Sequence, residues 1–363
     1  GLPLVVRPSY VLGGRAMEIV HEKSQLKNFV EEAFKAAEEN PILIDKFLDH
    51  AMEVDVDAIS DGKDVYVAGI MQHIEEAGIH SGDSACSLPP VSIKPYLIKE
   101  IENQTKKLAL ALKVKGFMNI QYAIKKDEIY IIEVNPRASR TVPFVSKAKG
   151  IPLAKIASRI MAGEKLSKFN LKDKSKGIYA VKEAVFPFNK FPDSDLLLGP
   201  EMKSTGEVMG FDDDFGMAIA KSQIAASNSL PKKGLAFLSV KDSHKQEVIG
   251  IAQRLTKLGF SLSATKGTAN IIKENGMSCK IINKVSSGRP HIVDVLSSGK
   301  ISLVINTGGG NSEHRISDAR ALRRGTLANK IPYCTNMSTA YSFLEAIKSL
   351  KTKKLTVKSL QDQ

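Results

Sequence analysis

The sequence predicts two parts in tandem, a mixed α+β part followed by a doubly wound parallel α/β part. Three observations lead to this fold class. The chain has 363 residues, more than one typical hydrophobic core accommodates. Its first part mixes helices with neighbouring strands and ends at a linker, "SNSLPKKG", at residues 227–234. Beyond the linker strands and helices alternate regularly. We therefore expect domains at residues 1–227 and 228–363.

The first part opens inside a core strand, "LPLVVRPS", and a helix is predicted over residues 24–40. Apolar side chains recur there at helical spacing after Ser24, a favourable N-cap residue. The next strand, residues 52–60, alternates, with Glu53, Asp55 and Asp57 on one face and Val54, Val56 and Ala58 on the other. Residues 64–71 are predicted to pair with it across the turn at Asp61 and Gly62.

A long loop is predicted over residues 73–90, "HIEEAGIHSGDSACSLPP", and loops of this length inside a domain are usually functional. A helix over about residues 94–113 follows, then two strands at residues 117–124 and 128–134, and then a helix that begins near Pro152. In the second part a helix is predicted over residues 245–259, and strands are predicted over residues 235–240, 260–265, 279–283, 301–307 and 331–335.

Composition excludes several functional classes. Hydrophobic content is 43% and charged content 25%, as in ordinary globular proteins. The net charge of +13 comes mostly from dispersed lysines, without aromatic-rich basic stripes, so we expect nucleotides or small anions as ligands rather than nucleic acid. Three cysteines, Cys86, Cys279 and Cys334, lack metal-type spacing, which suits the cytoplasm. No apolar run is long enough to span a bilayer, so no membrane association is expected.

Polar side chains gather at the end of the strand "EIYIIEVNPRASR". Glu133 and Asn135 are two residues apart in a strand and therefore point to one face. A carboxylate and an amide oxygen side by side suit a hard divalent cation. Arg137 and Arg140 follow in a loop, where guanidinium groups can bind carboxylate or phosphate. The alternative is an ordinary polar strand end, and this stretch alone does not decide between them.

Gln121 must share the face of Glu133 to join the same metal site. In an antiparallel hairpin this requires an odd number of loop residues or a bulge. A three-residue loop, Lys126–Glu128, would pair Lys125 with Ile129 and would set Gln121 across from Glu133.

Two further features suit a nucleotide. Arg7 ends a strand ahead of a loop with Gly13 and Gly14, and a cation with exposed backbone amides suits a polyphosphate. This signal is weak alone, because it matches neither of the common glycine-rich phosphate motifs. Glu53 opens the acidic face of its strand, from which a carboxylate could bind ribose hydroxyls.

The second part carries three loops that each follow a strand, where doubly wound domains bind ligands. "TKGT" offers hydroxyls and amides at a helix N-terminus, "NK" offers a lysine, and "INT" is followed by a glycine-rich turn. Each loop alone could be ordinary loop chemistry, but together they favour a phosphorylated ligand. Their residues are Thr265, Lys266, Gly267, Thr268, Lys284, Asn306 and Thr307.

Several motifs together resemble an ATP-grasp ligase, specifically the second ATP-grasp module of the carbamoyl phosphate synthetase large-subunit family. They are "RPSYVLGGRAM", "EVDVDAI", "GIHSGDSACSLPP" and "IEVNPRASRTVPFVSKA", with "VKEAVFPFNKFP" and "LGPEMKSTGEVMG" downstream. The tail resembles the methylglyoxal-synthase-like regulatory domain of that family. The resemblance covers essentially the whole chain. It implies an ATP-grasp fold that is incomplete at its N-terminus, followed by this regulatory domain.

The resemblance assigns roles residue by residue. Arg137 and Arg140 would stabilise carbamate and the transferring phosphoryl group, and Gln121, Glu133 and Asn135 would bind Mg²⁺ or Mn²⁺, with K⁺ a further candidate. The residues that would bind ATP are Arg7, Lys46, Leu48, Glu53, Gly78, Ile79, His80, Ser81, Gln121 and Glu133. A regulatory nucleotide would be bound by Lys245, Thr265, Thr268, Lys284 and Asn306. The positions that hold ornithine in bacterial relatives correspond to Glu75, Asp83, Glu183 and Thr335.

One departure concerns Gly308, which stands where bacterial relatives carry a second threonine, so uridine and inosine monophosphates both stay open as effectors. The implied activity is ATP-dependent formation of carbamoyl phosphate for pyrimidine and arginine biosynthesis. The implied partners are an absent N-terminal part of the large subunit and, through it, a small glutaminase subunit. The alternative is an inert fragment that acts only as a regulatory nucleotide-binding module. A methylglyoxal-forming lyase is disfavoured, because no Asp and His pair accompanies the phosphate loops.

Overall fold

The computed structural model of the chain describes residues 1–9, 11, 13–38, 40–171, 177–190, 196–307 and 313–360. Internal packing divides the chain into two compact units. The first comprises Gly1–Ala184, Leu198–Asp213 and Thr356–Gln363, and the second comprises Val185–Leu197 and Asp214–Leu355. The domain limits expected from the sequence, 1–227 and 228–363, stay a prediction.

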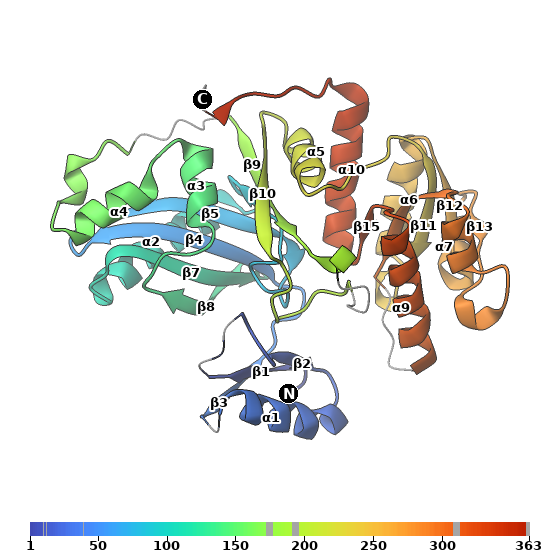
Figure 1. The fold of residues 1–363 in the computed structure, drawn as a ribbon, viewed down its shortest axis with the longest axis horizontal. Coiled ribbons are helices and arrows are strands. Elements are labelled where there is room, and N and C mark those ends of the chain that lie inside the picture. Colours follow the sequence, from blue (N-terminus) through green and yellow to red (C-terminus); the bar gives the residue numbers. More distant parts are fainter. Residues whose placement is uncertain are drawn as a thin grey trace. The chain divides into compact units, whose positions relative to one another are not determined.

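A small antiparallel sheet begins the first unit (Figure 1). Its strands, in the order β2-β1-β3, are β1 Leu4–Pro8, β2 Glu18–Val20 and β3 Ile42–Lys46. Helix α1, Lys23–Ala36, packs Ala33 against Val6 and Val20 of this sheet. The expected cap at Ser24 is wrong. The extended residue before the helix is Glu22, so Ser24 already lies in the first turn, where its hydroxyl donates to Glu22.

The large sheet of the first unit has seven strands in the order β10-β9-β6-β5-β4-β7-β8. They are β4 Met52–Asp61, β5 Val65–Glu76, β6 Cys86–Leu88, β7 Lys115–Lys125, β8 Glu128–Asn135, β9 Tyr179–Val185 and β10 Gly206–Asp212. The long loop expected at 73–90 is therefore shorter. His73 pairs with Cys86, because β5 runs on to Glu76 and β6 forms a rung between β5 and β9.

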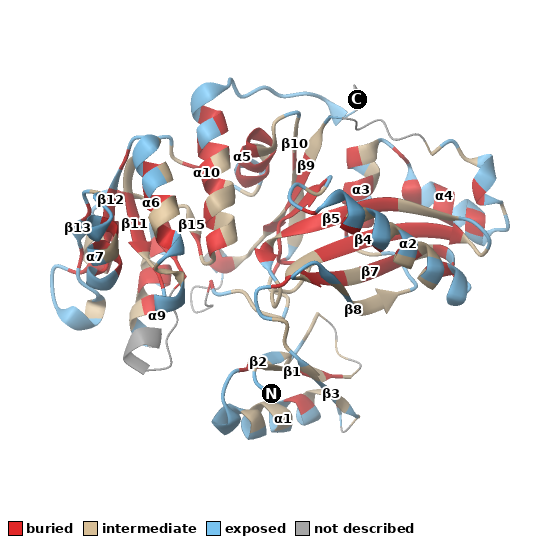
Figure 2. Ribbon diagram, turned by 180° about the vertical axis from the view of Figure 1, so that it is seen from behind, coloured by how far each residue is buried: buried red, intermediate tan, exposed pale blue. Residues whose placement is uncertain are grey.

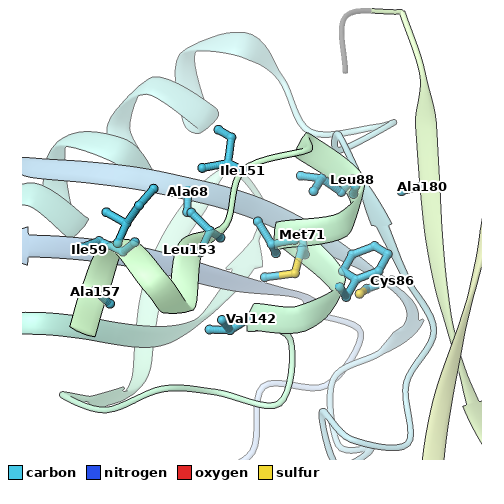
Figure 3. Close-up of a cluster of buried hydrophobic side chains, with 14 of the residues drawn as sticks. Ile59, Ala68, Met71, Cys86, Leu88, Val142, Ile151, Leu153, Ala157 and Ala180 are labelled. Atoms are coloured by element: carbon cyan, nitrogen blue, oxygen red, sulfur yellow. The ribbon is translucent and has the colours of Figure 1, made fainter. Parts of the chain in front are cut away.

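Helices cover both faces of this sheet. Helix α2, Pro95–Ala111, packs Leu97 and Ile101 on one face, and a buried hydrogen bond of 3.0 Å joins the hydroxyls of Thr105 and Tyr122. Helices α3, Val142–Lys149, and α4, Leu153–Met161, cover the other face around Met71, Cys86 and Leu88 (Figure 3). Helix α3 was not expected from the sequence. It places the segment after Asn135 against the sheet.

The hairpin between β7 and β8 differs from the expected one. Its turn has two residues, Lys126 and Asp127, with φ of 50° and 65°, so Lys125 pairs with Glu128 and the expected three-residue loop is wrong. A register shift between Gln121 and Tyr122 compensates for this difference. Gln121 therefore pairs with Glu133, as expected, and the bulge rather than the turn brings them together.

The second unit contains a five-stranded parallel sheet in the order β13-β12-β11-β14-β15, which confirms the doubly wound fold. Its strands are β11 Gly234–Ser239, β12 Phe260–Ala264, β13 Lys280–Ile281, β14 Ile301–Asn306 and β15 Tyr333–Cys334. Figure 2 shows the central strands as buried. The order reverses between β11 and β14, which is where doubly wound sheets open a crevice at their carboxyl ends.

The helices of this unit are α5 Phe215–Ala225, α6 Glu247–Lys257, α7 Lys266–Glu274, α8 Ile292–Ser297, α9 Glu313–Ala328 and α10 Met337–Thr352. This unit also has short 3₁₀ turns at Phe188–Lys190, Asp242–His244 and Val285–Ser287, and the first unit has one at Leu166–Lys168. Asp214 caps α5 by accepting from the Met217 amide, and it also accepts from Ser349 and Lys353. This carboxylate ties α5 to α10, so α5 belongs to the second unit although it precedes the linker.

Candidate functional site

A cavity of about 890 Å³ opens in the first unit between the small sheet and the face of β4, β7 and β8. Its size is that of a typical small-molecule site. The structure brings all the sequence-predicted catalytic, ATP and metal residues to its wall. They are Arg7, Lys46, Leu48, Glu53, Gly78, Ile79, His80, Ser81, Gln121, Glu133, Asn135, Arg137 and Arg140.

At the cavity wall beside β1, glycine lets the backbone approach neighbouring groups closely. A side chain at Gly14, whose φ is +68°, would place its Cβ 2.2 Å from the Pro200 carbonyl oxygen, so only glycine fits there. Arg7 projects from β1 and its guanidinium lies 3.2 Å from Asp45 Oδ2 and 3.5 Å from Glu133 Oε2. A cation and a glycine turn thus lie at the same wall, as a polyphosphate site requires.

Glu53 belongs to a cluster of acidic side chains around the buried His73 that the sequence did not reveal. Glu53 Oε2 lies 3.3 Å from His73 Nδ1, and Asp55 Oδ2 lies 3.0 Å from His73 Nε2. Burial acts to lower the pKa of His73, but the hydrogen bond to Asp55 and the adjacent carboxylate of Glu53 outweigh it and raise this pKa to about 9. The imidazolium therefore holds Glu53 toward the cavity, where Glu53 Oε1 also accepts from the Gly78 amide.

The amide and carboxylate groups on β7 and β8 form one cluster. Asn135 Nδ2 donates to Glu133 Oε1 at 2.8 Å, and Gln121 Nε2 donates to Ser81 Oγ at 2.8 Å. The amide nitrogens are thus engaged, and carbonyl oxygens remain as ligand atoms. Within the described ranges no group of three His, Cys, Asp or Glu side chains could hold a metal ion. One carboxylate with amide oxygens nonetheless fits Mg²⁺ that is completed by phosphate oxygens.

The two predicted arginines reach the cavity from the loop after β8. Arg137 donates to the Ala138 carbonyl at 3.0 Å, and Arg140 Nη1 lies 2.7 Å from Met202 Sδ. Among the residues that the structure describes, neither guanidinium forms an ion pair. Two cations without carboxylate partners at a cavity wall suit an anionic ligand.

His80 lies close to Arg140, one of these two arginines. Burial lowers its pKa, Asp83 counteracts this effect, and the positive charge of Arg140 adds to the lowering. Its Nδ1 accepts from the Gly82 amide at 3.0 Å, which leaves Nε2 to carry the proton of a neutral imidazole. A neutral His80 offers the cavity a hydrogen bond rather than a charge.

Other residues of the wall were missed by the sequence analysis. Lys182, which is 1% exposed, donates from β9 to the carbonyls of Ser81 and Ser84 and so holds the loop that carries His80. Asn119, Glu207, Ser139 and Thr141 also line the cavity. Ser139 and Thr141 stand beside Arg140 in the sequence, but no spacing signal assigned them or Asn119 and Glu207 to the site, and the fold brings the four together.

A second cavity, of about 390 Å³, lies at the carboxyl ends of the strands in the second unit. All five predicted effector residues line it, namely Lys245, Thr265, Thr268, Lys284 and Asn306. A Cβ added at Gly267 would lie 3.3 Å from Lys245 Nζ, so the helix N-terminus and this ammonium group are close neighbours. Lys245 also pairs with Asp242 at 2.5 Å, and Gly308 lies outside the described residues.

The four residues expected at an ornithine site are divided between the units. Glu75 accepts from the Ala85 amide, and Asp83 accepts from the amides of Lys203 and Ser204, all within the first unit. Glu183 lies in β9, and Thr335 follows β15 in the second unit. Their joint role stays a prediction. None of the helices in the described part of the chain combines the length and the apolar character needed to cross a membrane.

Comparisons with known proteins identify related sequences along the whole chain. The model of the "Carbamoyl-phosphate synthase L chain, ATP binding domain" matches residues 1–169, and that of the "MGS-like domain" matches residues 247–335. The "Carbamoyl phosphate synthase large chain, C-terminal section" of Aquifex aeolicus is 50% identical, over 100% of this chain and 71% of that protein. The large chain of Methanobrevibacter smithii is 53% identical over 99% of this chain, which spans only 34% of that relative.

Among solved structures, a likeness is found to the biotin carboxylase domain of Hydrogenobacter thermophilus 2-oxoglutarate carboxylase, solved with MgADP, ADP and bicarbonate. The TM-score is 0.50 at 18% identity, over 62% of this chain and 56% of that one. At this identity the likeness concerns the fold alone.

Proposed function

The chain belongs to the family of carbamoyl phosphate synthase large chains, and from this premise we propose that its first unit phosphorylates carbamate with ATP to give carbamoyl phosphate. One observation carries the proposal. A single cavity gathers a phosphate-type wall, an oxygen-donor cluster for a divalent cation and two arginines that form no ion pair with any residue that the structure describes. These are the parts that transfer of a phosphoryl group between two anions requires.

ATP would be held by three groups. Arg7 and the turn at Gly13 and Gly14 would bind its phosphates through charge and backbone amides. Lys46 and Leu48, at the end of β3, would flank the adenine, and Glu53 would accept from the ribose hydroxyls. The imidazolium of His73 keeps Glu53 oriented and partly neutralised for that contact.

Gln121, Glu133 and Asn135 would hold Mg²⁺, with Mn²⁺ as a substitute and K⁺ as an additional monovalent ion. When bound, the divalent ion would neutralise negative charge on the phosphates of ATP. Glu133 would serve as the anionic ligand of this set, and the Asn135 amide fixes the orientation of its carboxylate through the 2.8 Å hydrogen bond.

In the reaction a carbamate oxygen attacks the γ-phosphorus. The bond between that phosphorus and the β,γ-bridging oxygen breaks, and its electron pair leaves with ADP. Arg137 and Arg140 would bind carbamate and take up the negative charge that spreads over the equatorial oxygens. A neutral His80 would donate a hydrogen bond without adding charge. The cavity wall would keep water from carbamate, which hydrolyses readily.

The reverse reaction offers a direct test. The assembled enzyme that contains this chain should form ATP from ADP and carbamoyl phosphate in the presence of Mg²⁺. Arg140→Ala should lower this rate by about a hundredfold, because a charge-stabilising donor is lost. Arg159→Ala, which removes an exposed guanidinium paired with Glu164, is the matched control. An enzyme with a folded chain that forms no ATP would overturn the proposed reaction.

The second unit supports a second function, the binding of a regulatory nucleoside monophosphate. The observation that favours it is the convergence of Lys245, Lys284 and the N-terminus of α7 on one cavity. Ornithine is proposed as a further effector through Glu75, Asp83, Glu183 and Thr335. Calorimetric titration with uridine and inosine monophosphates tests the site, and the absence of binding below about 1 mM would contradict it.

The remaining proposals concern context. The chain spans about a third of full-length large chains, so its activity is expected to need the N-terminal portion and, through that portion, a glutaminase subunit that supplies ammonia. The product would feed pyrimidine and arginine synthesis in the cytoplasm. The competing proposal, a chain that only binds regulatory nucleotides, predicts effector binding to the second unit without any ATP formation by the assembled enzyme.

A further inference from the structure

Asp57 is the most deeply buried carboxylate on the acidic face of β4, with 1% of its surface exposed. Three hydrogen bonds converge on it. Oδ2 accepts from Thr141 Oγ1 at 2.6 Å, and Oδ1 accepts from Ser139 Oγ at 2.7 Å and from Asn119 Nδ2 at 2.9 Å. All three donors are neutral. A buried carboxylate without a cationic partner is costly, so a structure that keeps one satisfies it with several donors.

Two of these donors lie 82 and 84 residues away in sequence, in the segment that carries the arginines. Ser139 and Thr141 flank Arg140, and Ser139 is two residues after Arg137. Their hydroxyls also bond to each other at 2.8 Å. Asp57 thus binds this segment through two hydrogen bonds, to Ser139 and to Thr141. The Thr141 carbonyl accepts from the Val145 amide in the first turn of α3.

The third donor extends the same support to the metal cluster. Asn119 pairs across the hairpin with Asn135, and it lies next but one to Gln121 on β7. The carboxylate of Asp57 therefore touches the strand that carries one predicted metal ligand and the loop that carries both arginines. Asp57 itself is not part of the cavity wall.

We propose that Asp57 is a positioning residue, which fixes the Ser139–Thr141 segment so that Arg137 and Arg140 present their guanidinium groups to the carbamate end of the cavity. The proposal rests on the function proposed above. The ionised carboxylate is the state that accepts all three hydrogen bonds. Burial raises the pKa of Asp57 to about 6 against the lowering by Thr141, Ser139 and Asn119, so this state still prevails at neutral pH.

The first test uses Asp57→Asn, in which an amide nitrogen replaces one acceptor oxygen at constant size. In the assembled enzyme the KM for carbamoyl phosphate in ATP formation should rise by about tenfold or more, which is the effect of one lost charge-assisted hydrogen bond. The KM for ADP should stay within about twofold, because Arg7 lies on β1, Lys46 on β3 and Glu53 four residues before Asp57 on β4, so none of them belongs to the Ser139–Thr141 segment. A purely structural role would change both constants together.

Two further variants guard against misfolding of Asp57→Asn. Thr141→Val removes one hydrogen-bond donor to Asp57 and should raise the KM for carbamoyl phosphate, though less than Asp57→Asn does. Thr141→Ser keeps the hydroxyl and should keep this KM near the wild-type value. Thr105→Val is the matched control, because it removes a buried threonine hydroxyl that bonds to Tyr122 away from the cavity. In the double variant of Asp57→Asn and Ser139→Ala the KM should rise no further than in Asp57→Asn alone.

Hydrogen exchange supplies a readout that is independent of activity. Backbone amides of residues 137–145 should exchange faster in Asp57→Asn and Thr141→Val than in the wild type, and those of β1 and β3 should not. Unchanged exchange of this segment, or an unchanged KM for carbamoyl phosphate in an active Asp57→Asn enzyme, would overturn the proposal. If the wild-type enzyme forms no ATP but the segment still exchanges faster in Asp57→Asn, the positioning role of Asp57 is supported and the proposed phosphorylation of carbamate is refuted.

Discussion

Replacing His73 by glutamine is expected to remove a pH-dependent part of the stability of the first unit. The imidazole is 3% exposed and lies 3.3 Å from Glu53 and 3.0 Å from Asp55. Despite the opposing effect of burial, these two carboxylates raise its pKa from 6.5 to about 9. A shift of this size corresponds to about 3 kcal/mol of differential stability.

The direction follows from the raised pKa. Between pH 6.5 and about 9 the folded chain holds a proton on His73 that the unfolded chain has released. The contribution is complete below pH 6.5 and is lost as the pH rises through about 9. Wild-type protein should therefore lose about 3 kcal/mol over this window beyond what His73→Gln loses.

Two measurements check this expectation. Nuclear magnetic resonance of labelled histidines should show one imidazole that stays protonated well above neutral pH and is absent from His73→Gln. Urea unfolding followed by circular dichroism, between about pH 6 and pH 9.5, should show converging stabilities of the two proteins at high pH. His50→Gln, at an exposed imidazole beside Glu76, is the control. Titration of every imidazole below about pH 7, or a constant stability difference, would refute the reasoning.

Three further predictions follow from the sites. Glu133→Gln should raise the Mg²⁺ concentration needed for half-maximal ATP formation about tenfold or more. If both residues bind one ion, the double variant of Glu133→Gln and Asn135→Asp should need no more Mg²⁺ than the worse single variant. An unchanged Mg²⁺ dependence of Glu133→Gln would contradict its place in the metal site. Lys284→Met should weaken nucleoside monophosphate binding about tenfold to a hundredfold by calorimetry, and equal affinity would contradict the effector site. Relative to Asp57→Asn, the wild type should lose about 3 kcal/mol of stability as the pH rises from 3.8 through about 6, because Asp57 binds its proton more tightly in the folded state. Parallel urea-unfolding stabilities of the two proteins across this window would contradict the expectation.

The sequence was informative where chemistry is local. The alternation of Glu53, Asp55 and Asp57 predicted one acidic face of β4, and the i, i+2 spacing predicted that Glu133 and Asn135 share a face. The alternation of strands and helices beyond residue 234 predicted the parallel sheet. Such features depend on the periods of strands and helices, which a single sequence displays directly.

What the sequence did not reveal depends on contacts between distant segments. His73 lies in a stretch expected to be a loop, and only the pairing of β5 with β6 and β4 places it between Glu53 and Asp55. Asp57 resembles its neighbours in the alternation, yet its three hydrogen-bond partners lie 62, 82 and 84 residues away in the sequence. The attachment of α5 to α10 through Asp214 likewise joins residues far apart in sequence, so the linker at residues 227–234 alone could not indicate it.

The bulge opposite Gln121 also makes one register of this hairpin far more favourable than its neighbour. Without the bulge, a two-residue turn would pair Gln121 with Ile132 and would turn Glu133 toward the core beneath α2, among Ile120 and Tyr122. An ionised carboxylate buried there without a partner would cost several kcal/mol. The Glu133 side chain, which is proposed to bind the metal, therefore also raises the free energy of the hairpin in which Gln121 pairs with Ile132. Replacing Glu133 by an apolar residue would relax that selection, so inactive variants of this kind are expected to populate two strand registers.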